Sequence, residues 1–220
     1  MTEVSRSLGR PEDPALKARR VGEILDAATA MFAKRGYGET QVQAIADELG
    51  IGNGTIYRYF PTKEKLFLAA VERGLNELTA SMDALLERGD PAEHLLESAI
   101  ECYLEFFHRK PELAELFIQE RAAFPHHHRP LYFVMKDEDD CKHRPFFEAL
   151  VAGGVIRDIP APRFFDVISD LLYGTILTNL LAGRRVTPAE QAADILDVIG
   201  YGVWSDTARR KHRKRTGGSK

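Results

Sequence analysis

Three consecutive polar residues, Tyr57, Arg58 and Tyr59, could contact nucleic acid if a short helix presents them outward. A guanidinium binds guanine edges or phosphate, tyrosine hydroxyls donate to phosphate, and tyrosine rings can contact thymine methyl groups. Ile56 and Phe60 are four residues apart, so in a helix they share one apolar face and would hold it against the protein. The pattern therefore favours a short, anchored helix with a polar outer surface.

A second short helix is predicted just before it, from Val42 to about Leu49, and Gly50-Ile51-Gly52 forms a turn between the two. Two short helices joined by a glycine-containing turn are typical of the helix-turn-helix, whose second helix enters the major groove of DNA. Asn53 can cap the second helix, and Pro61 ends it. A three-helix subdomain with a plain polar surface is the alternative interpretation.

The rest of the chain shows helical periodicity. Apolar residues between positions 17 and 35 recur at three- and four-residue steps, and Gly36 supplies a stop. Further helices are predicted at residues 63–87, 92–109, 112–123, 130–152, 163–182 and 189–209. No segment has the pattern of a strand, so the sequence predicts an all-α fold with about nine helices.

The charges are unevenly distributed along the chain. Residues 1–63 carry nine Lys or Arg and eight Asp or Glu, residues 64–205 have a net charge of −10, and residues 206–220 have a net charge of +6. The acidic middle would repel DNA, whereas the two ends would not. Because the head is only weakly basic, DNA binding there depends on where its few cations lie.

Two observations bear on the compartment. Cys102 and Cys141 form no closely spaced pair, which fits a reducing cytoplasm. The first residues lack the apolar core of a signal peptide, and the longest apolar stretch, 171–183, is shorter than the roughly 20 residues that span a bilayer. We therefore expect a soluble cytoplasmic protein without a membrane partner.

The run FAKRGYGETQVQAIADELGIGNGTIYRYFPTKEKLF, residues 32–67, resembles the N-terminal domain of the tetracycline-repressor (TetR) family of bacterial regulators. The matching features are Phe-x-x-x-Gly-Tyr, the threonine at position 40, Ile-Ala-x-x-x-Gly, Gly-x-x-Tyr-x-Tyr-Phe and Lys-Glu-x-Leu-Phe. The resemblance implies a homodimeric, nucleoid-associated transcriptional regulator. It further implies a repressor that leaves a near-palindromic double-stranded operator when a small-molecule effector binds.

The resemblance also implies DNA contacts at the matching positions. Those at the start of the second helix are Thr40, Gln41 and Val42; those on the recognition helix or its lead-in are Gly52, Asn53, Thr55, Tyr57, Arg58 and Tyr59; the phosphate-binding lysine is Lys63. Relatives often carry Lys where this chain has Asn53, which removes one charge. Arg6 and Arg10 could enter the minor groove from an N-terminal arm, although a disordered arm is the alternative.

The two last predicted helices are candidates for dimerisation. The helix at 163–182 is apolar almost all round, so it must be buried on two sides, and Gly200 and Gly202 in the following helix permit close approach. The resemblance implies a dimer through these helices, and burial of both within one protomer is the alternative. The expected interface residues are Ile168, Leu172, Ile176, Ile195, Ile199 and Val203.

Polar residues in apolar register indicate where an effector could bind. Glu120 is in step with Leu113 and Phe117, and Glu138 is in step with Leu131 and Val134. A buried carboxylate needs a partner, which could be a basic side chain of the protein or a cationic or hydroxylated ligand. The expected pocket residues are Tyr103, Phe107, Phe117, Glu120, Glu138 and Tyr173, and the effector itself cannot be identified from them.

Metal, cofactor and catalysis are not predicted. His126-His127-His128, Cys141 and His143 lack the spacing of a metal site, so we interpret them as solvated. A nucleophile motif, a phosphate loop and an acid–base pair are all missing, which disfavours an enzyme. A dimeric DNA binder without an effector is a further alternative. The expected division is an arm at 1–15, a DNA-binding domain at 16–62, an effector-binding and dimerisation domain at 63–208, and a basic disordered tail at 209–220.

Overall fold

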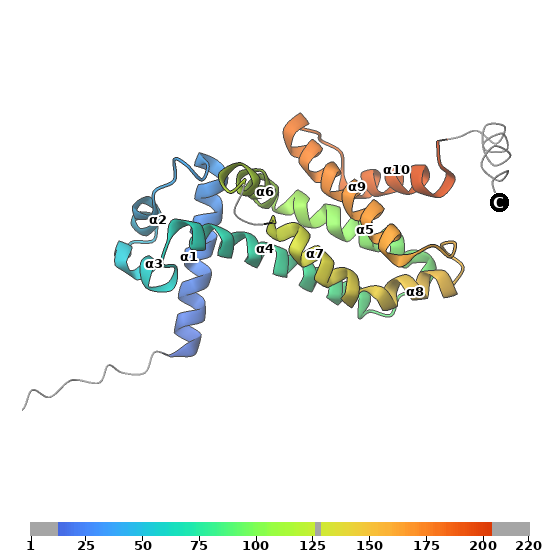
Figure 1. Ribbon diagram of the computed structural model, residues 1–220, viewed down its shortest axis with the longest axis horizontal. Helices are drawn as coiled ribbons and strands as arrows, with labels where there is room; N and C mark the ends of the chain where they lie inside the picture. Colours follow the sequence, from blue (N-terminus) through green and yellow to red (C-terminus); the bar gives the residue numbers. More distant parts are fainter. Residues whose placement is uncertain (1–12, 126–128, 204–220) are drawn as a thin grey trace, which may run out of the picture. The chain divides into compact units, whose positions relative to one another are not determined.

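The computed structural model describes residues 13–125 and 129–203. These residues form ten α-helices and no strand, so the predicted all-α fold is confirmed (Figure 1). The chain divides into two compact units, residues 1–77 with 111–139 and residues 78–110 with 140–220. The unit boundary falls inside two helices, α4 and α7, whereas the expected division placed it after residue 62.

The first unit holds the helices of the predicted DNA-binding segment together with later ones. Its helices are α1 (Pro14–Arg35), α2 (Val42–Glu48), α3 (Asn53–Tyr59), the first part of α4 (Lys63–Leu86), α6 (Pro111–Ala123) and most of α7 (Leu131–Lys142). The Asp13 side chain caps the start of α1 by accepting from Ala15 N at 3.0 Å. Gly36 ends α1 with a φ of 85°, a conformation that favours glycine.

An aromatic cluster forms much of the core of this unit. Phe32 at the end of α1 is fully buried, and its ring centroid lies 5.1 Å from that of Phe67 on α4. Tyr37 packs edge-on against Phe124, with 4.9 Å between the centroids. Gln119 on α6 adds a polar link, because its Nε2 donates to Phe32 O at 2.9 Å. The cluster therefore ties the end of α1 to α4 and α6.

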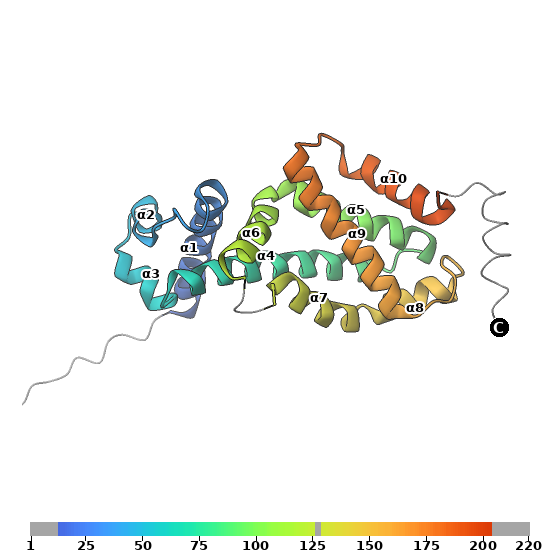
Figure 2. The same ribbon diagram turned by 45° about the horizontal axis from the view of Figure 1, so that its top comes forward.

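The second unit is built around α5. Its helices are the end of α4, α5 (Ala92–Arg109), the end of α7, α8 (Arg144–Ala152), α9 (Ala161–Ala182) and α10 (Pro188–Tyr201). α5 contacts α8, α9 and α10, and Figure 2 shows it beside α9 and α10. A buried cluster joins Leu95 to Phe147, Leu150 and Phe164. Thr187 and Glu190 form a capping box at the start of α10, and its hydrogen bonds lower the pKa of Glu190.

Two predicted helix bounds were wrong. The helix expected at 130–152 is two helices, α7 and α8, which meet at His143. Pro145 lies in the first turn of α8, where its missing N–H costs nothing, whereas in a continuous helix it would remove a hydrogen bond and clash. The last helix, expected at 189–209, ends at Tyr201, where Gly202 follows with a φ of 73°, and residues 204–209 lie outside the described part of the chain.

Replacing Phe32 with alanine should lower the free energy of unfolding by about 3–5 kcal/mol, because the whole buried ring is lost from the cluster. Denaturant unfolding at fixed protein concentration measures the change. Val134→Ala, at a side chain 37% exposed in the same unit, is the control and should change this free energy by under about 1 kcal/mol. Equal stability of Phe32→Ala and the wild-type protein would mean that the cluster is not a core.

Candidate nucleic-acid interface

Helices α2 and α3 cross as a helix-turn-helix. Ile45 and Ala46 of α2 and Ile56 of α3 are fully buried, and the two helices contact each other. The turn closes α2 through a hydrogen bond from Ile51 N to Ala46 O at 3.0 Å. Gly50 has a φ of 63°, which a glycine adopts at no cost. The local sequence therefore fixes the angle at which the second helix leaves the first.

The outer surface of α3 is polar. Tyr57 is 42% exposed and Arg58 is exposed, whereas Tyr59 is half-buried. Phe60 follows the helix with extended backbone, and its N–H donates to Ile56 O at 2.9 Å. Two of the three polar side chains thus face outward, as the spacing predicts, while Tyr59 lies partly against the protein.

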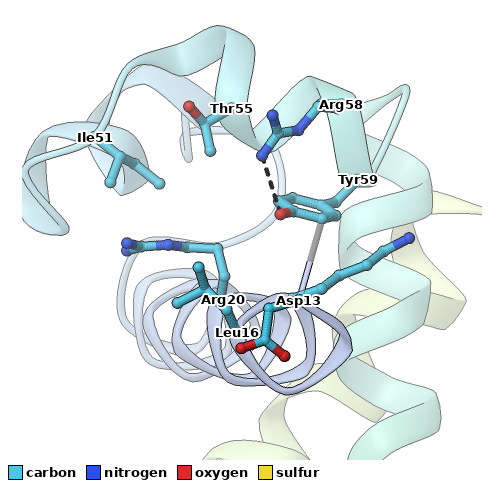
Figure 3. Close-up of a pocket in the computed structure, with 8 residues that line it drawn as sticks. Asp13, Leu16, Arg20, Ile51, Thr55, Arg58 and Tyr59 are labelled. Atoms are coloured by element: carbon cyan, nitrogen blue, oxygen red, sulfur yellow. Dashed lines mark hydrogen bonds between the residues drawn. The ribbon is translucent and has the colours of Figure 1, made fainter. Parts of the chain in front are cut away.

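Arg58 and Tyr59 form a pair at the edge of this surface. Arg58 Nη2 donates to Tyr59 Oη at 3.0 Å, and the guanidinium carbon lies 5.0 Å from the centre of the tyrosine ring (Figure 3). Because the hydroxyl accepts one N–H, it restrains the guanidinium without using up its five donors. Tyr59 therefore positions Arg58, a role that sequence reasoning did not foresee.

The residues expected at the start of α2 divide into two kinds. Thr40 is fully buried, and its Oγ1 lies 2.7 Å from Gly36 O and 3.3 Å from Met31 O. Val42 is 5% exposed and belongs to the core. Gln41 between them is exposed. Of these three expected contacts, only Gln41 presents its side chain to the surface, and the backbone N–H and C=O of Thr40 are bonded to Gly36 O and Lys63 Nζ.

Lys63 is already bonded within the protein. Its Nζ donates to Gly38 O at 3.1 Å and to Thr40 O at 3.0 Å, and it lies 4.5 Å from the centre of the Tyr37 ring. These bonds join the start of α4 to the loop between α1 and α2. Lysine has three N–H donors, so one remains available to a phosphate. Lys63, the expected phosphate-binding lysine, therefore also stabilises the loop between α1 and α2.

The remaining expected contacts lie around the start of α3. Asn53 is half-buried, and its Oδ1 is buried with no hydrogen-bond partner, so this amide oxygen points inward rather than to a ligand at the surface. Gly52 and Gly54 are exposed, and a Cβ at either would meet nothing within 4 Å. Their backbone is therefore open to a close approach. Thr55 is half-buried and lines a cavity beside α3.

The expected effector residues of the first unit differ in burial. Glu120 is 1% exposed, and its Oε1 accepts from Leu131 N at 3.0 Å, so a backbone N–H at the start of α7 is one partner of this carboxylate. The Phe117 ring lies 5.4 Å from that of Tyr132. Glu138 is exposed, contrary to the expectation that it faces inward. α7 buries only Tyr132 among its side chains, so its apolar spacing does not mark a core face.

The other expected effector residues belong to the second unit. Tyr103 and Phe107 are buried on α5 with their rings 5.0 Å apart, and Tyr173 on α9 is half-buried. The six expected residues are thus split between two units, each described by itself. Their grouping around one effector stays a prediction.

A cavity that sequence reasoning missed lies within the second unit. Its volume is about 450 Å³, and Leu86, Leu95 and Phe146 are among the apolar residues that line it. At its rim the Asp83 carboxylate accepts from the Lys142 ammonium and lies 3.1 Å from His143 Nε2. The hydrogen bond from Lys142 is the main cause that lowers the pKa of Asp83. No pattern in the sequence pairs residues about 60 positions apart.

The expected dimer residues are also divided. Leu172 and Ile176 are 6% and 3% exposed, so they are buried inside their own protomer, and Ile168 and Ile195 are half-buried. Ile199 and Val203 are exposed. The exposed apolar side chains of α9 are Val167, Leu171 and Leu181, at 58%, 38% and 75%. The interface stays a prediction, and the apolar residues on both faces of α9 gave its sequence pattern no preferred side.

α9 is also long and apolar enough to cross a membrane, the only such helix among the described residues. Its 22 residues extend beyond the stretch 171–183 considered from the sequence, so length alone does not exclude this. One such helix is weak evidence, because the mostly buried core helices of soluble proteins pass the same test, although only 17% of the apolar window of α9 is buried in the single chain. In the described part of the chain, no group of three or more His, Cys, Asp or Glu could hold a metal, and residues 126–128 lie outside it.

The crossed helices and the exposed polar surface of α3 place this chain in the class of helix-turn-helix proteins. A sequence model described as bacterial regulatory proteins, tetR family, matches residues 24–70. The HTH-type transcriptional regulator YhgD of Bacillus subtilis is 30% identical over 129 residues, 54% of this chain and 68% of YhgD. The chain belongs to the tetR family of bacterial regulatory proteins, which confirms the resemblance.

Two further comparisons set the extent of the likeness. The HTH-type transcriptional repressor KstR of Mycolicibacterium smegmatis is 40% identical over 73 residues, 33% of this chain and 36% of KstR. This chain thus spans about a third of the length of that relative. The structure of the transcriptional regulator FadR of Bacillus subtilis in complex with stearoyl-CoA has a TM-score of 0.66 at 19% identity, over 83% of this chain and 99% of that chain. It shares the fold.

Replacing Lys63 with methionine should lower the free energy of unfolding by about 1–3 kcal/mol, because two carbonyls lose a charged donor. Thermal unfolding measures this, and Lys65→Met, at an exposed lysine two residues away, is the control. If Lys63→Met left stability unchanged, the two hydrogen bonds would not hold the loop.

Proposed function

We propose that this protein is a homodimeric transcriptional repressor that binds a near-palindromic operator through α3 and releases it when a small-molecule effector binds. The observation that carries the proposal is the outward presentation of Tyr57 and Arg58 on a helix whose Ile56 is fully buried. Its similarity to KstR, which is named a repressor, supports the direction of regulation.

The proposed DNA contacts follow from exposure. Arg58 is placed to bind guanine edges or phosphate, and Tyr57 to reach the edges of bases or the backbone. Gln41 and the backbone of Gly52 and Gly54 would contact the phosphates next to the bases that α3 reads. Two copies of α3, about 34 Å apart in a dimer, would read successive turns of the major groove.

The proposed dimer forms through α9 and α10, the helices with the most exposed apolar side chains of the second unit. Val167, Leu171 and Leu181 on α9 and Val198 and Ile199 on α10 lie at the surface of the single chain. Covering a large apolar surface removes it from water and stabilises the protein, and a second copy would cover this surface symmetrically. This also explains why α9 is apolar on two sides without requiring a membrane.

The proposed effector is an organic molecule with a substantial apolar part. The cavity lined by Leu86, Leu95 and Phe146 has about 450 Å³, which lies in the usual range for small-molecule sites. The related fold of Bacillus subtilis FadR, whose structure holds stearoyl-CoA, supports an effector in general and does not identify this one. A dimeric DNA binder without an effector is the competing function. Adding apolar ligands to a preformed DNA complex distinguishes these two functions, because only an effector-controlled repressor would release the DNA.

Arg58→Ala should lose sequence discrimination while non-specific DNA binding survives, because a bidentate contact to a base is worth about 1–3 kcal/mol. Selection of bound duplexes from a random library would first give the operator. Fluorescence anisotropy should then show a specific Kd about 10- to 100-fold weaker in Arg58→Ala. Arg109→Ala, at a largely exposed arginine of the second unit, is the matched control. Undiminished discrimination in Arg58→Ala would remove α3 as the reading helix.

Leu171→Glu should convert the dimer into folded monomers, because the new carboxylate would lie in the apolar contact. Leu172→Glu, one residue further, should instead destabilise the protomer, since this side chain is only 6% exposed. Light scattering after size-exclusion chromatography gives the mass, and circular dichroism gives the fold. A Leu171→Glu protein that stays dimeric would move the interface away from this face of α9.

A further inference from the structure

A cationic cavity lies between α1 and α3 within the first unit. It has a volume of about 270 Å³ and is lined by three cations, Lys17, Arg20 and Arg58, by the hydroxyl groups of Thr55 and Tyr59, and by Asp13. We propose that this cavity receives a backbone phosphate of bound DNA, so that the first turns of α1 form part of the DNA interface. The inference rests on the proposed function, because it requires α3 to lie on DNA.

The charge balance of the cavity favours an anion. Three cationic side chains and one carboxylate, that of Asp13, line the cavity, while Glu23, the ion-pair partner of Arg20, is not among the lining residues. This carboxylate already accepts a hydrogen bond from Ala15 N at 3.0 Å as the cap of α1. Two hydroxyls among the lining residues can donate to phosphate oxygens, which accept from several donors at once.

The cations come from both walls of the cavity. Figure 3 shows the side chain of Arg20 extending from α1 and that of Arg58 from α3, with space between the two helices. Arg20 is also paired with Glu23 at 2.9 Å, on the surface of α1. Surface ion pairs of this kind contribute about 0–1 kcal/mol, so the guanidinium can exchange Glu23 for a phosphate at little cost.

The position of the cavity indicates DNA as the source of the phosphate. Arg58 both lines the cavity and belongs to the exposed surface of α3, so α3 in a major groove would bring the flanking backbone close to α1. The volume is roughly nine times the 30 Å³ that one water occupies in the liquid, which leaves room for a phosphate group. Lys17 and Arg20 lie outside residues 24–70, the part that matches the family, so the match does not imply this contact.

The test measures two properties of DNA binding, its salt dependence and its sequence discrimination, because the proposal expects only the first to change. The variants are Lys17→Gln, Arg20→Gln and the double variant, each in the full-length chain. Arg19→Gln is the matched control, because Arg19 is on the same helix with a side chain 67% exposed and does not line the cavity. Melting temperature and helical content check that each variant is folded.

The expected result is weaker binding to all duplexes alike. Each lost phosphate contact should reduce the slope of log Kd against log salt concentration by about 0.9, and by twice that in a dimer altered in both copies. The ratio of specific to non-specific Kd should stay unchanged, and Arg19→Gln should behave as wild type. Slopes and affinities equal to those of the wild type in folded Lys17→Gln and Arg20→Gln would overturn the inference, while the proposed function would stand.

A second measurement separates bound DNA from a free anion. Titration calorimetry with inorganic phosphate, in the absence of DNA, should give no saturable binding at millimolar concentration. Saturable binding that Lys17→Gln abolishes, together with unchanged DNA affinity of that variant, would assign the cavity to a free anion and overturn the inference. Failure of the wild-type protein to bind any duplex would instead overturn the proposed function.

Discussion

The interface depends on the burial of one side chain, Ile56. A helix of seven residues is too short to be stable by itself, so α3 exists because this side chain packs among the buried residues of the first unit. The same contact sets the rotation of α3 about its axis. Once Ile56 faces inward, the geometry of a helix places Tyr57 and Arg58 at the surface, and the hydrogen bond to Tyr59 then restrains the Arg58 guanidinium.

Polar groups that could have served DNA instead hold this arrangement in place. The Thr40 hydroxyl and the Lys63 ammonium both bind backbone carbonyls around the loop between α1 and α2, and Tyr59 restrains Arg58. These bonds tie the loop to the ends of α1 and α4, so the proposed function would use α2 and α3 as a preformed surface. Preorganisation of this kind lowers the ordering cost of binding. The proposed DNA binding would therefore need few cations from the first unit, and the inferred phosphate contact would draw some of them from α1.

The second unit differs from the first, because α9 and α10 leave large apolar side chains exposed to solvent. Leu181 is 75% exposed and Val167 is 58% exposed, while Leu172 on the same helix is buried. In the proposed dimer, a symmetric partner would cover this apolar surface. Reading two half-sites of an operator would require the same symmetry, so in the proposed function one surface would serve both stability and recognition.

The sequence by itself determined the all-α class, the positions of most helices and the outward surface of α3, because these follow from periodicity and from Gly and Pro within a few residues. Tertiary structure alone decided which face of α9 is buried, that Glu138 is exposed, and that Lys63 bonds to Gly38 and Thr40. Such pairings join residues far apart in the chain, or choose between two apolar faces of one helix. Neither choice leaves a local pattern, since it depends on what the rest of the fold places opposite.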